Sequence, residues 1–201
     1  MKPAVLCIDR SQLKPGNQIY HQEIYSIPSD SFHFMNRKTV DASDITIGQQ
    51  FPQVIVYCVV HRNDKVLSYS RKKGAEERLH GTRSIGIGGH VDLEDACLSE
   101  GQIDVYKTIK ASMERELEEE LSLNLDSSVI YLDYILVSEE NDVSKVHVGL
   151  VEYLRISEDE KIVYSDEIYD PQWLTVEELK QTKDQYEAWS QMVIDTLGEG
   201  V

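Results

Sequence analysis

The chain has 201 residues, of which 41% are hydrophobic and 28% are charged. This length suits one domain with a substantial core, and the apolar content is that of a globular protein. The formal net charge of −16 disfavours a nucleic-acid polymer as partner, because the two would repel each other. No apolar run approaches the roughly 20 residues of a membrane span, and residues 1–9 hold too short an apolar run for a signal peptide.

The three cysteines, Cys7, Cys58 and Cys97, lack the spacing of a metal site. Cys7 and Cys58 lie within apolar runs that predict strands, so we expect buried thiols. Free thiols are typical of a reducing compartment, and the sequence therefore predicts a cytoplasmic protein.

Residues 1–50 give the weakest structural signals. Residues 5–8 predict a first strand, and Pro15-Gly16-Asn17 predicts a turn. We interpret residues 1–50 as an N-terminal extension that packs on a domain spanning residues 51–201.

The signals sharpen after residue 53. Residues 54–60 are continuously apolar and rich in β-branched side chains, which predicts a central strand covered on both faces. Residues 65–71 follow a turn and predict its hairpin partner. Residues 84–88 predict a short strand that leads into Gly88-Gly89. Basic side chains flank this stretch and are either phosphate contacts or part of a solvated loop: Arg71, Lys72, Lys73 and Arg83.

Residues 105–121 predict a helix, with Asp104 as its N-cap. Apolar residues recur at every fourth position and predict a buried stripe: Val105, Ile109, Met113, Leu117 and Leu121. Glu116, Glu119 and Glu120 are spaced i, i+3 and i+4 and should share another face, turned away from that stripe. Like charges so close repel each other, whereas a divalent cation such as Mg²⁺ or Mn²⁺ would bridge them. The alternative is a solvated acidic face.

Three further features complete the predicted elements. Residues 129–137 and 146–154 predict strands, and residues 162–164 a last short one. Thr175 followed by Glu178 is a capping box. Residues 184–197 predict the final helix.

The run from Arg115 to Leu123, with Gly89 upstream, resembles the Nudix box of the Nudix hydrolases. The matching positions are Arg115, Glu116, Leu117, Glu119, Glu120 and Leu123. Asp95 stands where the family has its first Glu, and Ser122 replaces the last Gly. Nineteen residues (96–114) separate Asp95 from Arg115 where the family has seven, which is an insertion of twelve.

The resemblance implies an α+β fold, a Nudix-type α/β/α sandwich with a mixed sheet, over residues 51–201. It implies hydrolysis of a pyrophosphate bond in a nucleoside-diphosphate-linked or related small molecule, with Mg²⁺ or Mn²⁺ held by Glu116, Glu119, Glu120 and the carbonyl of Gly88. Arg115 would orient a neighbouring carboxylate. The substrate itself stays open, and a homodimer is expected only by analogy with relatives.

The general base has several candidates. One is Glu119, and others lie on downstream loops, namely Glu140 (the preferred one), Glu139 and Glu167. His90 is a candidate substrate contact beside Arg71, Lys73 and Arg83. Asp95 is expected to keep a supporting hydrogen bond, and Asn124 to stop the helix in place of the missing Gly.

Two other functions fit the same residues. One is a catalytically silent Nudix-fold module that binds a nucleotide or similar ligand, which loss of the box carboxylates would favour. The other is the isomerase branch of the family, suggested by Gly89-His90, but no cysteine stands in the context that this chemistry needs. Because Glu116, Glu119 and Glu120 are all present, a hydrolase is the leading prediction.

Overall fold

The computed structural model describes residues 4–41, 45–71, 82–125 and 129–198, except for the side chain of Arg71. Its contacts divide the chain into two compact units. The first unit comprises Met1–Tyr57, Gly88–Arg115 and Asp126–Glu152, and the second comprises Cys58–Ile87, Glu116–Leu125 and Tyr153–Val201. Three elements contribute one part to each unit: strand β4 (Gln53–Arg62), helix α2 (Val105–Leu121) and strand β11 (His147–Arg155).

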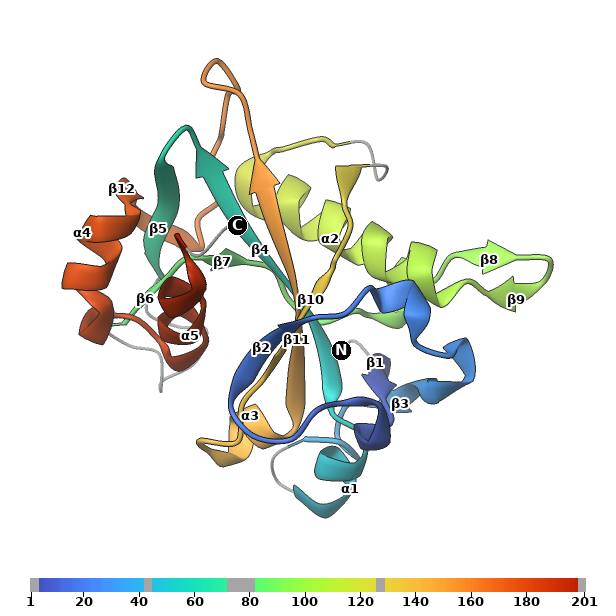
Figure 1. The fold of residues 1–201 in the computed structure, drawn as a ribbon. Coiled ribbons are helices and arrows are strands. Elements are labelled where there is room, and N and C mark those ends of the chain that lie inside the picture. The colour runs from blue at the N-terminus through green and yellow to red at the C-terminus, as the bar shows by residue number, and fades with distance from the viewer. Residues whose placement is uncertain (1–3, 42–44, 72–81, 126–128, 199–201) are drawn as a thin grey trace. The chain divides into compact units, whose positions relative to one another are not determined.

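Antiparallel strand pairs build the first unit (Figure 1). Strand β1 (Ala4–Ile8) pairs with β3 (Phe32–Asn36) and, at Cys7, with Gln53 of β4. Strand β10 (Tyr134–Val137) lies between β2 (Gln18–His21) and β11. Short helices connect these strands: η1 (Arg10–Gln12), η2 (Ile24–Ser26), η3 (Ser29–Ser31), α1 (Ile45–Gln50), η6 (Leu93–Asp95) and α3 (Asp142–Lys145).

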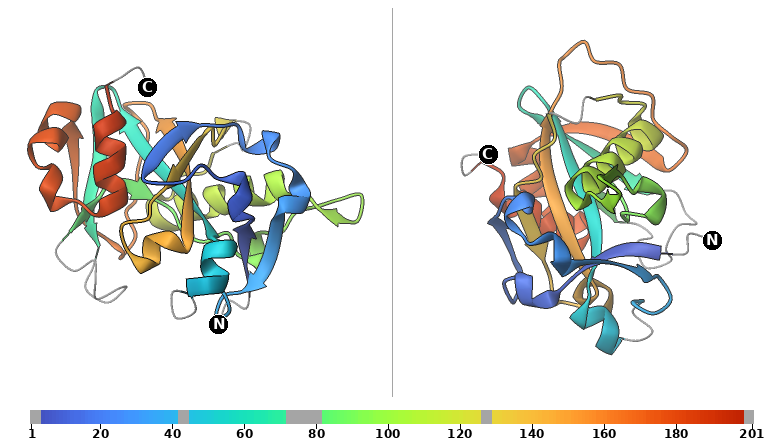
Figure 2. Two further views of the ribbon diagram at one scale, coloured as in Figure 1. Left: turned by 60° about the horizontal axis from the view of Figure 1, so that its bottom comes forward. Right: turned by 90° about the vertical axis from the view of Figure 1, so that its right-hand side faces the viewer.

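The second unit is built around the strand order β12-β5-β4 (Figure 2). Strand β5 (Lys65–Arg71) pairs antiparallel with β12 (Ile168–Thr175) and with β6 (Arg83–Ser84). Strand β7 (Gly86–Ile87) pairs with β4. Three helices follow β12: α4 (Val176–Gln181), η8 (Lys183–Gln185) and α5 (Ala188–Thr196).

Each unit has its own apolar core. In the first, Val5, Cys7 and Val40 form a fully buried cluster against which Met35, Ile47 and Phe51 pack. In the second, the fully buried side chains include Leu67, Tyr69, Leu117, Leu121 and Val193. Burying each large apolar side chain stabilises the fold by about 1.5–3 kcal/mol, so these clusters dominate the stability of both units. In the described part of the chain, no helix is both long and apolar enough to cross a membrane.

The cysteine prediction is confirmed in its structural part. Cys7 and Cys58 are buried, Cys97 is half-buried, and these three described cysteines form no disulfide with one another. Burial raises the pKa of the Cys7 thiol to about 12. This thiol is therefore protonated at neutral pH and behaves as a small apolar side chain.

Most predicted elements are confirmed, and the exceptions lie where the chain is short or irregular. Helix α2 begins after Asp104, whose Oδ1 accepts the Lys107 backbone N–H at 3.0 Å as an N-cap does. The Thr175–Glu178 capping box starts α4. Residues 129–137 shorten to β10, and residues 184–197 divide into η8 and α5.

Two segments differ more. The residues inserted between Asp95 and Arg115 include a two-stranded hairpin, β8 (Leu98–Ser99) and β9 (Gln102–Ile103), just before the first turn of α2 (Figure 1). The prediction of a strand at residues 162–164 is wrong. Instead, the backbone N–H of Val163 donates to the carbonyl of Leu121 at 3.1 Å, so this segment runs over the end of α2.

The end of α2 corrects another expectation. Ser122 itself, and not Asn124, reverses the backbone, with φ of +53°. Its N–H still donates to Glu118 at 3.0 Å, and the next N–H, of Leu123, reaches back to Leu117 at 3.2 Å. Ser122 is therefore held in the left-handed conformation, which glycine adopts without steric cost. Glycine is the residue that the Nudix box has at this position.

Ser122→Gly is expected to raise the free energy of unfolding by about 0.5–1 kcal/mol, because glycine removes the Cβ clash of the left-handed conformation. Urea denaturation followed by circular dichroism measures this difference. Ser157→Gly is the matched control, since Ser157 is exposed and its φ is not positive. Equal effects of the two substitutions would contradict this explanation of the helix end.

Candidate active site

The glycine turn before the candidate site is held against strand β4. Gly88 has φ of +149°, and a Cβ atom there would lie 1.9 Å from the carbonyl oxygen of Val56. The Val56 N–H in turn donates to the carbonyl of Gly89 at 3.0 Å. No residue with a side chain fits at position 88, so this glycine is required by the close approach of two backbone segments.

Arg115 and Asp95 form a bidentate ion pair within the first unit. Nε of Arg115 lies 2.7 Å from Oδ1 of Asp95, and Nη2 lies 3.0 Å from Oδ2. Only 4% of the Asp95 side chain and 22% of the Arg115 side chain is exposed. Paired, charge-assisted hydrogen bonds of this kind are strong and geometrically specific.

The same two side chains tie the glycine turn to helix α2. Nη2 of Arg115 also donates to the carbonyl of His90 at 3.2 Å, and Ser112 Oγ donates to that carbonyl at 3.3 Å. Oδ2 of Asp95 accepts the backbone N–H of Asp92 at 2.9 Å, which closes helix η6. Asp95 therefore makes the supporting hydrogen bonds expected of it, because η6 brings its shorter side chain close to Arg115.

The three box glutamates differ in burial. Glu116 and Glu120 are only 9% and 6% exposed, whereas Glu119 is exposed. Two of the three therefore do not lie on a solvated helix face. The segment after residue 162 covers the last turn of the helix, since the Ser165 N–H donates to the carbonyl of Glu120 at 2.9 Å.

The donor set of these glutamates fits a hard divalent cation, because Mg²⁺ and Mn²⁺ prefer carboxylate oxygens. Within the described residues, no three His, Cys, Asp or Glu side chains are already grouped so that they could hold a metal ion. The carboxylates belong to the second unit and Gly88 to the first.

The candidate bases on loops have different surroundings. Glu140 is exposed, and its backbone N–H donates to Ser138 Oγ at 3.5 Å. The carboxylate of Glu139 forms an ion pair with Arg10 and accepts the Gly16 N–H at 3.2 Å. Glu167 is exposed in the second unit. All three residues are exposed, and the carboxylate of Glu139 is already engaged in an ion pair.

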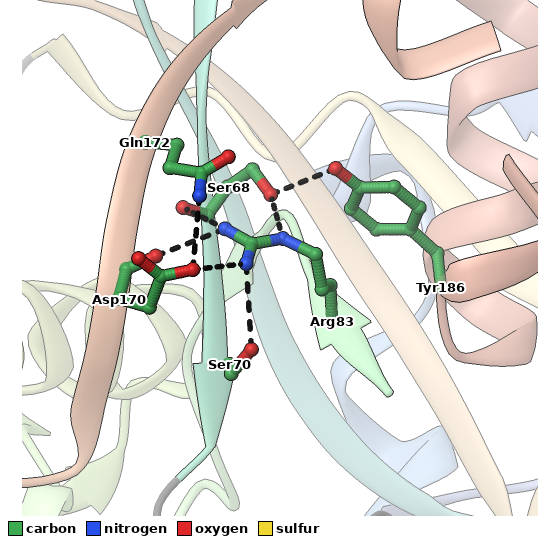
Figure 3. A network of polar contacts seen from close by, with 6 residues as sticks. All are labelled: Ser68, Ser70, Arg83, Asp170, Gln172 and Tyr186. Carbon is green, nitrogen blue, oxygen red and sulfur yellow. Dashed lines mark hydrogen bonds and ion pairs between the residues drawn. The ribbon is translucent and has the colours of Figure 1, made fainter. Parts of the chain in front are cut away.

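Arg83, a candidate substrate contact, lies in a polar network within the second unit (Figure 3). Its guanidinium donates to Ser68 Oγ at 2.9 Å, to the Ser68 carbonyl at 3.1 Å and to the Asp170 carbonyl at 2.9 Å. Nη1 also pairs with the Asp170 carboxylate at 2.8 Å. Arg83 depresses the pKa of that carboxyl group through this hydrogen bond, and Gln172 adds to the effect. The network binds β6 to the irregular part of β12, where Asp170 has φ of +48°.

The other candidate substrate contacts lie in different parts of the chain. Arg71 ends strand β5, and Lys72 and Lys73 lie outside the described residues. His90 is half-buried in the first unit, where its Nε2 lies 3.3 Å from Nε2 of His147.

Sequence reasoning missed one buried acid. Glu152 is 6% exposed in β11, and its Oε2 accepts the backbone N–H groups of Tyr131 and Leu132 at 2.7 and 2.8 Å. Burial raises the pKa of this carboxyl group. The available signal was a lone Glu inside an apolar strand, which demands a buried polar partner.

The sequence and the fold of this chain were compared with those of known proteins. No protein-family model matches the chain. The crystal structure of Tm1382, a candidate Nudix hydrolase, superposes with a TM-score of 0.73 and 20% identity, over 96% of this chain and 97% of that one. A bifunctional NMN adenylyltransferase/ADP ribose pyrophosphatase from Francisella tularensis, solved with AMP and a manganese ion, gives a TM-score of 0.50 and 20% identity over 74% of this chain and 42% of its own.

These likenesses confirm the α+β class and show that the chain has the Nudix fold. Protein YmaB of Bacillus subtilis (strain 168) is 31% identical over 207 residues, which cover 98% of each chain. The chain therefore belongs to the same protein family as Protein YmaB.

Asp95→Asn is expected to lower the free energy of unfolding by about 3 kcal/mol, because it removes the counter-charge of a partly buried guanidinium. Chemical denaturation measures the loss. Glu94→Gln, at the neighbouring exposed position, is the matched control and should change stability by less than about 0.5 kcal/mol. A loss at Asp95 no larger than that of the control would show that the ion pair contributes nothing.

Proposed function

We propose that this protein is a divalent-cation-dependent hydrolase that cleaves the pyrophosphate bond of a nucleoside-diphosphate-linked or related small molecule. The observation that carries the proposal is the pair Glu116 and Glu120, two buried carboxylates four residues apart on α2, directly after an arginine that is fixed by Asp95. Burying like charges this close has a cost that a bound cation offsets. The Nudix fold of the chain supports the same chemistry by analogy.

The residues that would hold the cation are Glu116, Glu119 and Glu120, with the carbonyl of Gly88. When bound, Mg²⁺ or Mn²⁺ supplies Lewis-acid stabilisation of the charge on the phosphoryl oxygens and makes water a better nucleophile. The net charge of −16 makes such a cation especially important here, since the protein would otherwise repel an anionic substrate.

The chain's own residues have distinct roles in this proposal. Arg115 positions the start of the acidic turn through Asp95 and the His90 carbonyl, and does not touch substrate. Glu119, exposed on the same turn, or Glu140 accepts the proton of the attacking water. We assign phosphate contacts to Arg71, Lys73 and His90. Arg83 could join them only by exchanging its hydrogen bonds to Ser68 and Asp170.

Three further proposals concern the location, the domain boundary and the assembly of the protein. The cysteines, which form no disulfide with one another, favour a cytoplasmic location. Residues 1–50 as an extension packed on a 51–201 domain, and a homodimer, stay predictions that limited proteolysis and light scattering can examine.

Glu120→Gln is expected to reduce metal-dependent hydrolysis by at least about 100-fold, because it removes a negative ligand while keeping the side-chain volume. The assay follows phosphate release from a panel of nucleoside diphosphate derivatives with Mg²⁺, with Mn²⁺ and with chelator. The matched control is Glu118→Gln, which makes the same change at an exposed position of the same helix and should retain activity.

Two outcomes would count against the hydrolase. Full activity in a folded Glu120→Gln protein would contradict the assignment of Glu120 as a ligand of the metal ion. If no compound is turned over by the wild type but one of them raises the melting temperature, the binding module becomes the better description.

A further inference from the structure

Two histidines, His90 and His147, meet in the first unit. His90 follows the glycine turn and forms a β-bridge with Ile55, and His147 opens strand β11. Their Nε2 atoms lie 3.3 Å apart, and the two rings stand edge to face with centroids 5.3 Å apart. Both residues are half-buried, so an ion from solvent can reach them.

The contacts of His147 determine which of its nitrogens carries the proton. Nδ1 lies 2.7 Å from the carbonyl oxygen of Val143, which can only accept a hydrogen bond. Nδ1 therefore carries the hydrogen, and in the neutral ring Nε2 presents its lone pair toward His90. Imidazoles that bind metals are typically held in this way, with the other ring nitrogen donating to a backbone carbonyl.

The backbone of His90 is also fixed. Its carbonyl accepts hydrogen bonds from both Arg115 and Ser112, and Ile55 bridges it to strand β4. Two imidazoles on well-anchored backbones thus lie next to each other before any ligand arrives, which lowers the entropic cost of binding one.

We propose that His90 and His147 form a two-imidazole site for a transition-metal cation of the zinc class. Two imidazole nitrogens bound to one tetrahedral ion, each at about 2.0–2.1 Å, are separated by about 3.3–3.4 Å. The observed separation of 3.3 Å matches this value. The ion would take the place of the proton between the rings, and the displaced hydrogen of His90 moves to its Nδ1, so no net proton is released.

This site differs in chemistry from the proposed cation site on Glu116, Glu119 and Glu120, and the residue it shares with the hydrolytic proposal is His90, a proposed phosphate contact. Imidazole nitrogen suits Zn²⁺, Ni²⁺, Co²⁺ and Cu²⁺, whereas Mg²⁺ prefers oxygen. Within the described residues, no third His, Cys, Asp or Glu completes a ligand group, so water would fill the other positions. A bound ion would connect the segment after the glycine turn to β11, both in the first unit.

The direct test is a titration of chelator-treated protein with Co²⁺, read by its visible absorption, and with Zn²⁺ by calorimetry. We expect one equivalent to bind in the presence of excess Mg²⁺. His90→Gln and His147→Gln should each weaken binding at least about tenfold, which is the effect that even an outer-shell partner of a metal ligand has. His21→Gln, on the exposed end of β2, is the matched control and should bind as the wild type does.

A second measurement needs no variant. In the wild type with ¹⁵N-labelled histidines, Zn²⁺ should shift the ring signals of two of the six histidines. Unchanged affinity in folded His147→Gln, or shifts spread over other histidines, would overturn the proposal. Because Glu120→Gln should still bind Co²⁺ at this site, failure here and failure of the hydrolase can be told apart.

Discussion

The bidentate pair between Asp95 and Arg115 is the interaction on which the rest of the candidate site depends. It joins the loop that follows the glycine turn to helix α2, although 19 residues separate the two side chains in sequence. The inserted residues include a hairpin before the helix, and Arg115 reaches Asp95 across this insertion.

Charge is the second constraint. Arg115 ends the part of α2 that belongs to the first unit, and Glu116 begins the part that belongs to the second. There the segment after residue 162 covers the helix end, and Glu116 and Glu120 are both buried. In a chain with a net charge of −16, two buried carboxylates do not serve solubility, because they face little solvent. They are better explained as residues kept for function than as a solvated helix face.

Periodicity and local chemistry made much of the fold predictable. Helix α2, strand β4 and the Thr175 cap follow from patterns of apolar residues and from side chains that hydrogen-bond the nearby backbone. The failures were all tertiary effects. Nothing local indicates that Ser122 takes a left-handed conformation, or that residues 163–165 lie on α2 instead of forming a strand. The burial of Glu120 follows from that same contact and so was equally out of reach.

The sequence predicted which residue types form the candidate site, but it did not predict most of the contacts between them. The spacing of the glutamates indicated a cation site, and Asp95 was expected to support it. The contact of His90 with His147 and the network around Arg83 required the fold, because each joins segments more than 50 residues apart. Gly88 was singled out for a close approach to a ligand, but the structure adds that its neighbour is the backbone of Val56.

The most direct test of the central claim is whether the acidic turn of α2 binds a divalent cation at all. Mn²⁺ binding can be measured by electron paramagnetic resonance, without any substrate, in the wild type and in a protein that carries both Glu116→Gln and Glu120→Gln. The account predicts that the wild type binds Mn²⁺, that Mg²⁺ competes with it, and that the double variant loses this binding while staying folded. Equal Mn²⁺ binding by the two proteins would contradict it.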